Sequence, residues 1–450
     1  MVVLKKDCNY KGKIFWKRKS RRNIKVTLFL FSLFFILLGL GVPIAIALGV
    51  ATLLAINNFT NVSLVIAPKI MFGAVDSFPL MAIPFFVLAG NVMSSGGISR
   101  RLVHFASSLV GTAIGGLAHV SIFASMFFAA ISGSSPATTA AIGAVMVPEM
   151  NKKGYSNNFS AAVVAAAGTV GVIIPPSIPM VLYAVLAGVS IGKLFLSGFG
   201  PGILMGLTMM LVAYIISKKR GYYGTEKVDF IGKIRAFRDS FFALMMPVII
   251  LGGIYGGIFT PTEAAAVAVV YGILIGLFIY RELNLKEIPE IIFNSAVGSA
   301  VIMFLIACAN LFGWFLVREM IPQEIAKAVL VLTKNPYIIL FLINIFLLIL
   351  GTLINTTAAI ILVTPILVPI LDQVGIDRLF MGIVMVVNLA IGMITPPVGL
   401  CLFVACNLAK ISLDKLTKEI FPFLIALILL IFVITYVPFI SMTLPNLLMK

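Results

Sequence analysis

Apolar residues fill most of the chain in long runs, and short polar or basic segments separate these runs. An α-helix needs ~20 predominantly apolar residues to cross the ~30 Å hydrocarbon core of a membrane. Several runs approach or reach that length without an internal break. They predict spanning helices near residues 78–93, 195–216, 242–258, 263–280, 292–316 and 421–440.

The first apolar run, residues 26–56, allows two interpretations. Gly39, Gly41 and Pro43 interrupt it, and both residue types favour the end of a helix. The run is therefore either one long tilted helix or two short spans that turn at Gly41-Val42-Pro43. The choice reverses the side of the membrane on which the N-terminus lies.

Four other apolar runs are broken near their middle. The runs 115–150 and 337–371 contain small and hydroxylic residues at the break, and each half has only about 15 residues, too few to span a membrane. Both runs therefore predict re-entrant hairpins of two half-helices. The runs 159–187 and 380–405 contain glycine and paired prolines, which predicts two discontinuous helices. A moderately amphipathic stretch precedes each hairpin.

Short motifs in these broken runs recur at a nearly constant interval. The letters TTAAI begin at Thr138 and again 218 residues later at Thr356, and a Gly-x-x-x-Pro-Pro motif begins at Gly171 and again 221 residues later at Gly392. Pro43 likewise precedes the proline of Thr260-Pro261-Thr262-Glu263 by 218 residues. Three matches in the same order predict an internal duplication.

Composition places the chain in a membrane. Hydrophobic residues make up 61% of the sequence and charged residues only 11%, so there is too little polar surface to cover a soluble globule of 450 residues. The mean hydropathy of +1.14 agrees. The net charge of +17 does not indicate a nucleic-acid partner, because the basic residues lie in short runs between apolar segments, where they determine topology.

The charge pattern divides the chain into an arm, two repeats and a linker. Residues 1–25 form a basic N-terminal arm with ten Lys or Arg against one acid. A first repeat at 26–217, a basic cytoplasmic linker at 218–238 and a second repeat at 239–445 follow. Basic residues follow the first hairpin but not the second, so the two repeats are expected to be inverted in the membrane. The predicted fold class is an all-α integral membrane protein with inverted repeats.

The broken segments point to a central binding site. An unwound backbone at membrane depth survives only where protein, water or a ligand satisfies its polar groups, and half-helix ends with free oxygens suit sodium and an anionic substrate. The candidate sodium ligands are Ser132, Ser134, Ser135, Gly168, Val170, Thr352, Asn355, Thr356, Gly392 and Thr395. The candidate substrate-binding residues are Gly133, Thr138, Thr139, Pro175, Pro176, Ser177, Thr357, Pro396 and Pro397.

Other interpretations compete with each of these assignments. Taken singly, a small or hydroxylic residue serves helix packing more often than ligand binding, and only the coincidence of break, hydroxyl cluster and repeat favours a site. Glu263 is the one acid in a conspicuous place near a span, yet Thr260, Pro261 and Glu263 form a capping-box sequence, which favours a structural role.

Other kinds of chemistry find little support in the sequence. It has no G-x-x-x-x-G-K-[ST] phosphate loop, and membrane-embedded acids and histidines, the usual proton carriers, are scarce, which favours sodium coupling. His104 and His119 are isolated, and the four cysteines lack metal or redox spacing. An enzyme needs a nucleophile–base or metal constellation, so a non-enzymatic function is expected.

At these motifs the chain resembles the large membrane subunit, the DctM-type or M subunit, of tripartite ATP-independent periplasmic (TRAP) transporters. The resemblance covers about residues 26 to 445 in motif order and length. It is carried by the run from Gly41 to Ala45, the first tip at 132–139, Ile174-Pro175-Pro176-Ser177, the FTPTEA run from Phe259 and the ITPPVG run from Ile394.

The resemblance implies sodium-driven import of a carboxylate-bearing solute, such as a C4-dicarboxylate or sialic acid, across a bacterial inner membrane. It implies two protein partners, a small four-helix membrane subunit (DctQ-type) and a periplasmic solute-binding protein (DctP-type), with lipid around the spans and no cofactor besides Na+. It also implies an elevator motion of the hairpins and broken helices against a fixed scaffold. The alternative is a stand-alone sodium–dicarboxylate symporter of the same wider superfamily.

Overall fold

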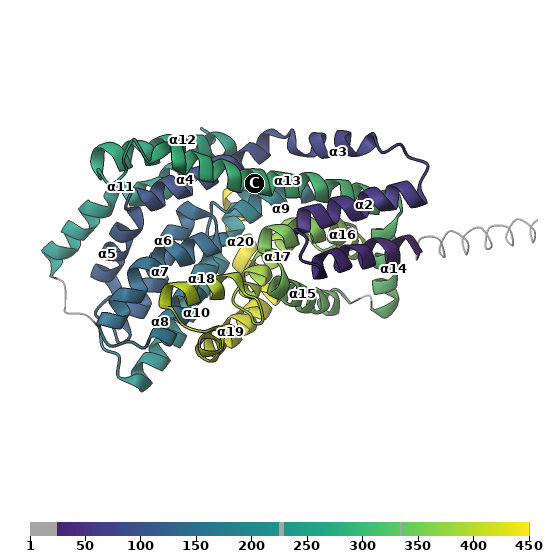
Figure 1. Ribbon diagram of the computed structural model, residues 1–450. Coiled ribbons are helices and arrows are strands. Elements are labelled where there is room, and N and C mark those ends of the chain that lie inside the picture. Colours follow the sequence, from purple (N-terminus) through teal and green to yellow (C-terminus); the bar gives the residue numbers. More distant parts are fainter. Residues whose placement is uncertain (1–24, 225–228, 334, 450) are drawn as a thin grey trace, which may run out of the picture. The chain divides into compact units, whose positions relative to one another are not determined.

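The computed structural model describes residues 25–224, 229–333 and 335–449, and every regular element in these ranges is a helix (Figure 1). Eight of the described helices are long and apolar enough to cross a membrane. The all-helical membrane class predicted from the sequence is therefore confirmed. The predicted basic arm lies outside the described residues except for Lys25.

The chain forms two compact units, and each takes segments from both halves of the sequence. Unit 1 contains the described part of Met1–Ser77 together with Val301–Lys334 and Ile361–Val374; unit 2 contains Phe78–Ala300, Asn335–Ile360 and Gly375–Lys450.

Unit 1 resolves the choice left open for the first apolar run. A helix over Lys25–Gly39 ends at a turn in which Gly41 has a φ of +81°, and α2 (Ile44–Phe59) then begins after Pro43. The rings of Phe29 and Phe59 meet edge to face at 5.2 Å. Because these residues come from the start of one helix and the end of the next, the two helices run antiparallel. Two short helices, not one long one, are present.

The rest of unit 1 consists of α3 (Ile66–Val75), the part of α13 (Ile288–Arg318) from Val301 onward, α14 (Ile321–Leu332) and the later part of α16 (Thr356–Val374). Aromatic and small residues pack α13 against the first two helices. The Phe34 and Phe312 rings lie 6.3 Å apart, and a Cβ on Gly49 would lie 3.3 Å from Cys308 Sγ.

Unit 2 carries both of the predicted hairpins' tips and both broken helices. The first helix pair is α6 (Gly116–Ser132) and α7 (Ser135–Lys152), and the second is α15 (Pro336–Leu353) and the start of α16. Each pair is joined by only two residues, 133–134 and 354–355. The first broken helix consists of α8 (Asn157–Gly168), the 3₁₀ turn η2 (Thr169–Val172) and α9 (Ile178–Ala187); the second consists of α17 (Arg378–Gly392) and α18 (Leu400–Ala409).

The two broken helices interleave within unit 2. The second half of the first, α9, packs on α17, while the second half of the second, α18, packs on α7 and α8 (Figure 1). Tyr183 on α9 donates a hydrogen bond from its hydroxyl to the Arg378 carbonyl at 2.7 Å, and Arg378 Nη1 donates to the Ala187 carbonyl at 3.1 Å. The duplicated segments thus form one core rather than two separate ones.

The remaining helices of unit 2 surround this core. They are η1 (Phe78–Met81), α4 (Ala82–Ser95), α5 (Ile98–Val110), α10 (Ile191–Arg220), α11 (Phe230–Tyr255), α12 (Pro261–Leu274), the π-helical turn η3 (Ile275–Ile279), α19 (Leu413–Tyr436) and α20 (Phe439–Leu448). Helices α4 and α12 pack against each other, and α5 lies against α6 and α11.

Helices enter both ends of the segment that the sequence assigned to a basic linker, 218–238. Helix α10 continues to Arg220 and α11 begins at Phe230, so basic residues here extend two helices instead of forming a long loop. Lys218, Lys219 and Arg220 occupy the last turn of α10, where cations interact favourably with the negative end of the helix dipole.

Candidate functional site

The first tip begins where Gly133 ends α6. Gly133 has a φ of +59°, a conformation that residues with a Cβ rarely adopt, and Ser134 is extended. Helix α7 then starts at Ser135 with a proline in its first turn, a position where the missing N–H is not needed. Glycine and proline thus reverse the chain within two residues.

Hydroxyl groups of the first tip bond to one another and to the backbone. The Ser132 and Thr138 hydroxyl oxygens lie 2.7 Å apart, and Thr138 Oγ1 also donates to the Ser134 carbonyl at 2.9 Å. Thr139 Oγ1 donates to the Ser135 carbonyl at 3.0 Å. All of these side chains except that of the half-buried Ser134 are almost wholly excluded from the surface.

The first tip lies directly against the first broken helix. Ser135 Oγ donates to the Thr169 carbonyl at 3.2 Å, and the Ile178 amide donates to the Gly133 carbonyl at 3.4 Å. A Cβ on Gly168 would lie 1.8 Å from Thr139 Oγ1, and one on Gly171 would lie 2.6 Å from the Ser134 carbonyl oxygen. Only glycine allows the tip and the break to approach this closely.

The first break is buried along its whole length, from Gly171 to Ser177. The Val170 carbonyl accepts hydrogen bonds from the Ile173 and Ile174 amides at 2.9 and 3.0 Å. Ser177 caps α9, because its Oγ accepts from the Met180 amide at 3.3 Å and donates to the Val172 carbonyl at 2.5 Å. Pro175 and Pro176, which are joined by a cis peptide bond, complete the break.

The second tip is built around a helix cap. Asn355 Oδ1 accepts a hydrogen bond from the Ala358 amide at 2.7 Å, which satisfies one of the free amides at the start of α16. Thr352 Oγ1 donates to the Ile349 carbonyl at 2.7 Å, and Thr356 Oγ1 lies 3.1 Å from Met393 Sδ. Asn355 is exposed, Thr352 and Thr357 are half-buried and Thr356 is buried.

The second tip also meets its broken helix through glycines. A Cβ on Gly392 would lie 2.5 Å from the Gly351 Cα, so α15 and α17 approach backbone to backbone. Thr395 Oγ1 donates to the Ile391 carbonyl at 2.9 Å. Pro396, joined to Pro397 by a cis bond, is half-buried and Pro397 is exposed, whereas the prolines of the first break are fully buried. The second tip and its break are therefore more exposed than the first tip and its break.

One side-chain contact joins the two sets of predicted site residues. Cys401, at the start of α18, lies beside Thr139 of the first tip, where α18 packs on α7. The structure thus brings a residue of the second break against the first tip. The sequence analysis treated Cys401 only as a small core residue, since nothing in its local spacing indicates a partner more than 250 positions away.

Sequence reasoning also missed a buried polar network next to the second site. Asn388 Nδ2 donates to Asn344 Oδ1 at 2.7 Å, and Asn344 Nδ2 donates to Thr435 Oγ1 at 3.0 Å. The three side chains are at most 1% exposed and link α15, α17 and α19. Asn388 Oδ1 has no hydrogen-bond partner among the described residues. The sequence feature that could have indicated this network was an asparagine within each of two strongly apolar runs.

Glu263 lies in a different setting. Thr260 and Glu263 form a capping box at the start of α12, in which the Thr260 amide donates to Glu263 Oε2 at 2.8 Å and the Glu263 amide donates to Thr260 Oγ1 at 3.3 Å. The neighbouring Thr262 Oγ1 donates to the Phe78 carbonyl at 3.0 Å. Pro261 occupies the first turn. These contacts join α12 to η1 and use the carboxylate in a helix cap.

Repeated halves with helices broken in their middle are typical of membrane transporters. The family model described as "Tripartite ATP-independent periplasmic transporter, DctM component" matches residues 31–440. The chain belongs to this family. It is the large permease type of subunit for solute import and a multi-pass protein of the inner membrane.

Two relatives and one solved structure illustrate the similarity. The chain is 48% identical over 414 residues to the isethionate TRAP transporter permease protein DctMQ of Oleidesulfovibrio alaskensis, which covers 92% of this chain but 65% of that protein. It is 44% identical over 376 residues to the C4-dicarboxylate TRAP transporter large permease protein DctM of Pseudomonas aeruginosa, covering 84% and 88% of the two chains.

The solved structure is similar in fold alone. The YdaH transporter of Alcanivorax borkumensis, described as having an unusual topology, superposes with a TM-score of 0.64 at 15% identity, covering 84% of this chain and 88% of that one.

Proposed function

We propose that this permease uses a sodium gradient to import a small organic anion. The two tips and two breaks would form the shared binding site, with the helix pairs re-entering the membrane from opposite sides. A periplasmic binding protein would deliver the solute, and a small four-helix subunit would support the scaffold. The unit of tips and breaks would then move as an elevator between the two faces of the membrane.

One observation carries the sodium assignment: the site hydroxyls point their protons into the backbone. Ser135, Thr138 and Thr139 donate to carbonyls at the first site, and Thr352 and Thr395 do so at the second. A hydroxyl that donates its proton keeps lone pairs that can face a cation. Neutral oxygens of this kind are the hard ligands that a small alkali cation takes, and no acid in either set offers a proton relay.

The class of substrate follows from chemistry shared by the relatives. The names of the two relatives include a C4-dicarboxylate, which carries carboxylates, and isethionate, which carries a sulfonate. Both are small organic anions, so a half-helix N-terminus such as that of α7 or α16 would favour either. We therefore propose a carboxylate as the solute, with a sulfonate as the chemical variant to compare.

Reconstituted transport tests this function. Purified permease with its small subunit in proteoliposomes should take up the anion only with an inward sodium gradient and the loaded binding protein, and added ATP should have no effect. Equal uptake driven by a proton gradient without sodium would overturn the coupling. Uptake without the binding protein would instead support the stand-alone symporter. Parallel assays with a C4-dicarboxylate and with isethionate identify the anion.

A further inference from the structure

A groove in unit 2 lies between α5 and the helix pair α6–α7 and has a volume of about 530 Å³. Volumes of roughly 300–1,000 Å³ are typical of ligand pockets. Its floor is apolar, with Val103, Val120 and Val145 among the lining side chains. Its edge carries Arg100, His104 and Lys153. The groove is thus apolar inside and basic at its rim.

One side of α5 forms the groove's wall. Arg100, Val103, His104 and Ser107 all line it, and their spacing of three and four residues places them on one helical stripe. The neighbouring Arg101 points away into a separate network. Helix α5 therefore presents two faces with different uses.

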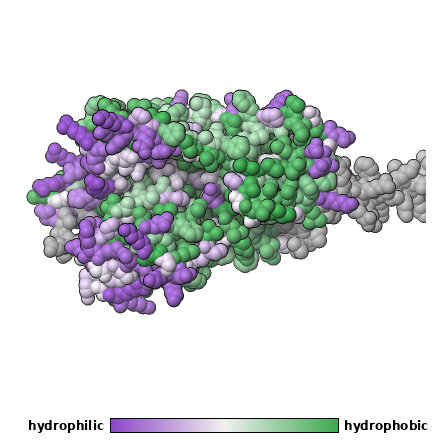
Figure 2. All heavy atoms as spheres, viewed as in Figure 1, coloured by the Kyte–Doolittle hydropathy of each residue, from purple (hydrophilic) through white to green (hydrophobic). Residues whose placement is uncertain are grey.

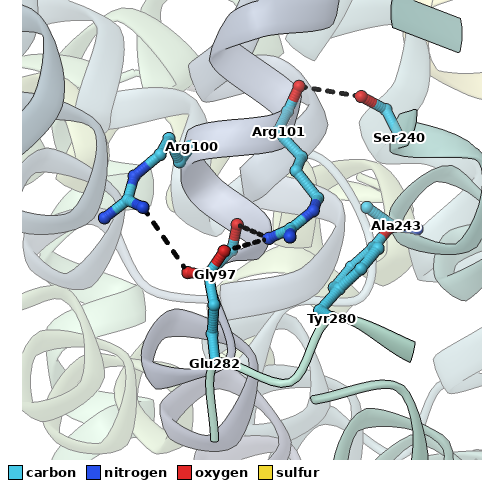
Figure 3. A network of polar contacts seen from close by, with 7 residues as sticks. All are labelled: Gly97, Arg100, Arg101, Ser240, Ala243, Tyr280 and Glu282. Atoms are coloured by element: carbon cyan, nitrogen blue, oxygen red, sulfur yellow. Dashed lines mark hydrogen bonds and ion pairs between the residues drawn. The ribbon is translucent and has the colours of Figure 1, made fainter. Parts of the chain in front are cut away.

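Figure 3 shows how that separate network occupies Arg101. Its Nη1 donates to Glu282 Oε1 at 2.6 Å and to the Gly97 carbonyl at 3.1 Å, and its guanidinium lies 3.8 Å from the centre of the Tyr280 ring. The Tyr280 hydroxyl accepts from the Ala243 amide at 3.0 Å, and Ser240 Oγ donates to the Arg101 carbonyl at 2.8 Å. Arg101 is committed to holding α5 against α11 and the segment that follows η3.

Arg100 is much less committed. Its Nη1 lies 3.7 Å from Glu282 Oε2, a carboxylate that Arg101 already binds, and the Arg100 side chain is 74% exposed. It lines both the groove and a second cavity of about 560 Å³ beside Arg238 and Asp239. Across the groove, Glu149 is paired with Lys152 at 2.9 Å, which leaves Lys153 outside that pair. Arg100 and Lys153 therefore supply positive charge at the groove's rim.

The groove lies at a hydrophilic end of unit 2, and Arg100, Lys153 and Arg238 line it or the cavity beside it. Figure 2 shows hydrophilic side chains gathered at the end that carries α5, α7 and the start of α11, next to an apolar outer surface. An excess of Lys and Arg marks the cytoplasmic side, where the leaflet is rich in anionic lipids. The position of the groove at the boundary between apolar and basic surface matches the place where a lipid headgroup lies.

We infer that this groove binds a phospholipid with an anionic headgroup. An acyl chain lies along the valine-lined floor, and the headgroup phosphate lies at Arg100 and Lys153. A guanidinium binds a phosphate through paired hydrogen bonds, and a lysine adds a point charge. A free phosphate would use the same cations but would leave the apolar floor uncovered, so the lipid is the occupant that uses the whole groove.

Native mass spectrometry of the full-length permease tests the inference with defined lipids. The protein is titrated with phosphatidylglycerol or with phosphatidylcholine of the same acyl chains, and bound lipid is counted. In Arg100→Gln/Lys153→Gln, retention of phosphatidylglycerol should fall roughly tenfold or more. Each basic residue near a membrane surface raises the affinity for an anionic lipid several-fold, and the variant removes two of them. Phosphatidylcholine retention should change little.

Matched variants separate the site from general surface charge. Lys233→Gln/Arg235→Gln removes two exposed cations from α11, neither of which lines the groove, and should retain phosphatidylglycerol as the wild type does. Ala144→Trp, at an exposed position of the groove, should displace both lipids without changing the charge.

Three retention results would overturn the lipid site. They are wild-type retention of phosphatidylglycerol by the folded Arg100→Gln/Lys153→Gln variant, wild-type retention by Ala144→Trp, and equal loss in the Lys233→Gln/Arg235→Gln control. Millimolar inorganic phosphate should not displace the lipid. Complete displacement would assign the rim to a free anion instead.

Discussion

At the scale of single residues, Asn355 has a structural task and a proposed functional one. Its Oδ1 caps α16 by accepting from the Ala358 amide at 2.7 Å, yet the residue is exposed at the second tip, where the sequence suggests a sodium ligand. The carbonyl oxygen of an amide has two lone pairs, so one can cap while the other faces a cation. Substitution can separate the two roles.

We predict that Asn355→Ala raises the sodium concentration needed for half-maximal uptake several-fold and lowers stability by about 1 kcal/mol, the usual effect of losing an N-cap. Asn355→Ser keeps a capping oxygen on a shorter side chain, so it should recover the stability but not the sodium affinity. Sodium-dependent uptake and thermal unfolding of the purified protein measure the two effects. If both variants keep the wild-type sodium dependence, Asn355 is a cap and nothing more.

The sequence assigned Val170 as a sodium ligand, but its carbonyl oxygen already accepts two hydrogen bonds from the backbone. Its carbonyl accepts from the Ile173 and Ile174 amides at 2.9 and 3.0 Å, so both lone-pair directions have a donor. The hydroxyls of Thr138 and Thr139, assigned to the substrate, instead donate to carbonyls; Thr138 then accepts from Ser132 with one lone pair, and each hydroxyl keeps at least one lone pair. Among the first site's oxygens these hydroxyls suit a cation better than the Val170 carbonyl does.

At the scale of elements, the contact between the first tip and the first break depends on glycine. A Cβ at residue 168 would lie 1.8 Å from Thr139 Oγ1 and 3.2 Å from the Ser135 carbonyl oxygen, so α7 and α8 would have to separate. Separation would break the bond from Ser135 Oγ to the Thr169 carbonyl, the contact that holds the tip on the break.

Gly168→Ala is therefore expected to abolish uptake and to lower stability by about 1–3 kcal/mol, the usual cost of overpacking a tight interior. Gly252→Ala is the matched control, because Gly252 lies within α11 and a Cβ there would have no neighbour within 4 Å. The control should transport normally and be no less stable, since alanine favours a helix more than glycine does. Normal uptake by Gly168→Ala would show that the tip does not need this close contact.

The sequence predicted the order of these elements because glycine and proline act locally. Gly133 and the paired prolines mark helix ends by their own backbone preferences, so breaks near the middle of the runs 115–150 and 159–187 could be placed without tertiary information. Helix ends that lie beyond the apolar runs could not be placed in this way. Helix α10 runs to Arg220 because polar residues also form helix once outside the hydrocarbon, and a hydropathy pattern stops earlier.

Tertiary contacts at the site also could not be predicted from the sequence. The Asn344–Asn388–Thr435 network joins residues from three separate helices, and the Cys401–Thr139 contact joins the two repeats. Each depends on how α9, α17 and α18 interleave, which no local pattern specifies. Repeated motifs predict that two halves are alike, but they do not predict which face of one half meets the other.

At the scale of the whole molecule, the proposed elevator motion requires the first tip to move relative to the surrounding helices. The structure places α4 against that tip: a Cβ on Gly90 would lie 3.5 Å from the Ser132 Cα. Asn91 of the same helix donates from Nδ2 to Ser295 Oγ on α13 at 2.8 Å, and α4 packs along α12. Helix α4 thus belongs with the helices that would stay fixed.

Gly90→Cys with Ser132→Cys, in a background whose four native cysteines are replaced by alanine, should form a disulfide, since a Cβ on residue 90 would lie 3.5 Å from the Cα of residue 132, which brings the two backbones within reach of the bond. Sulfur replaces oxygen at residue 132 and keeps a weak donor and acceptor, so the reduced variant should transport more slowly but measurably. Oxidation should stop uptake and reduction should restore it, because the bond holds the tip in one of its two positions. Ser132→Cys alone, treated with the same oxidant, should not change its rate. If the cross-linked protein transports at the rate of its reduced form, the tip does not travel past α4, and alternating access must come from local gating at the two breaks.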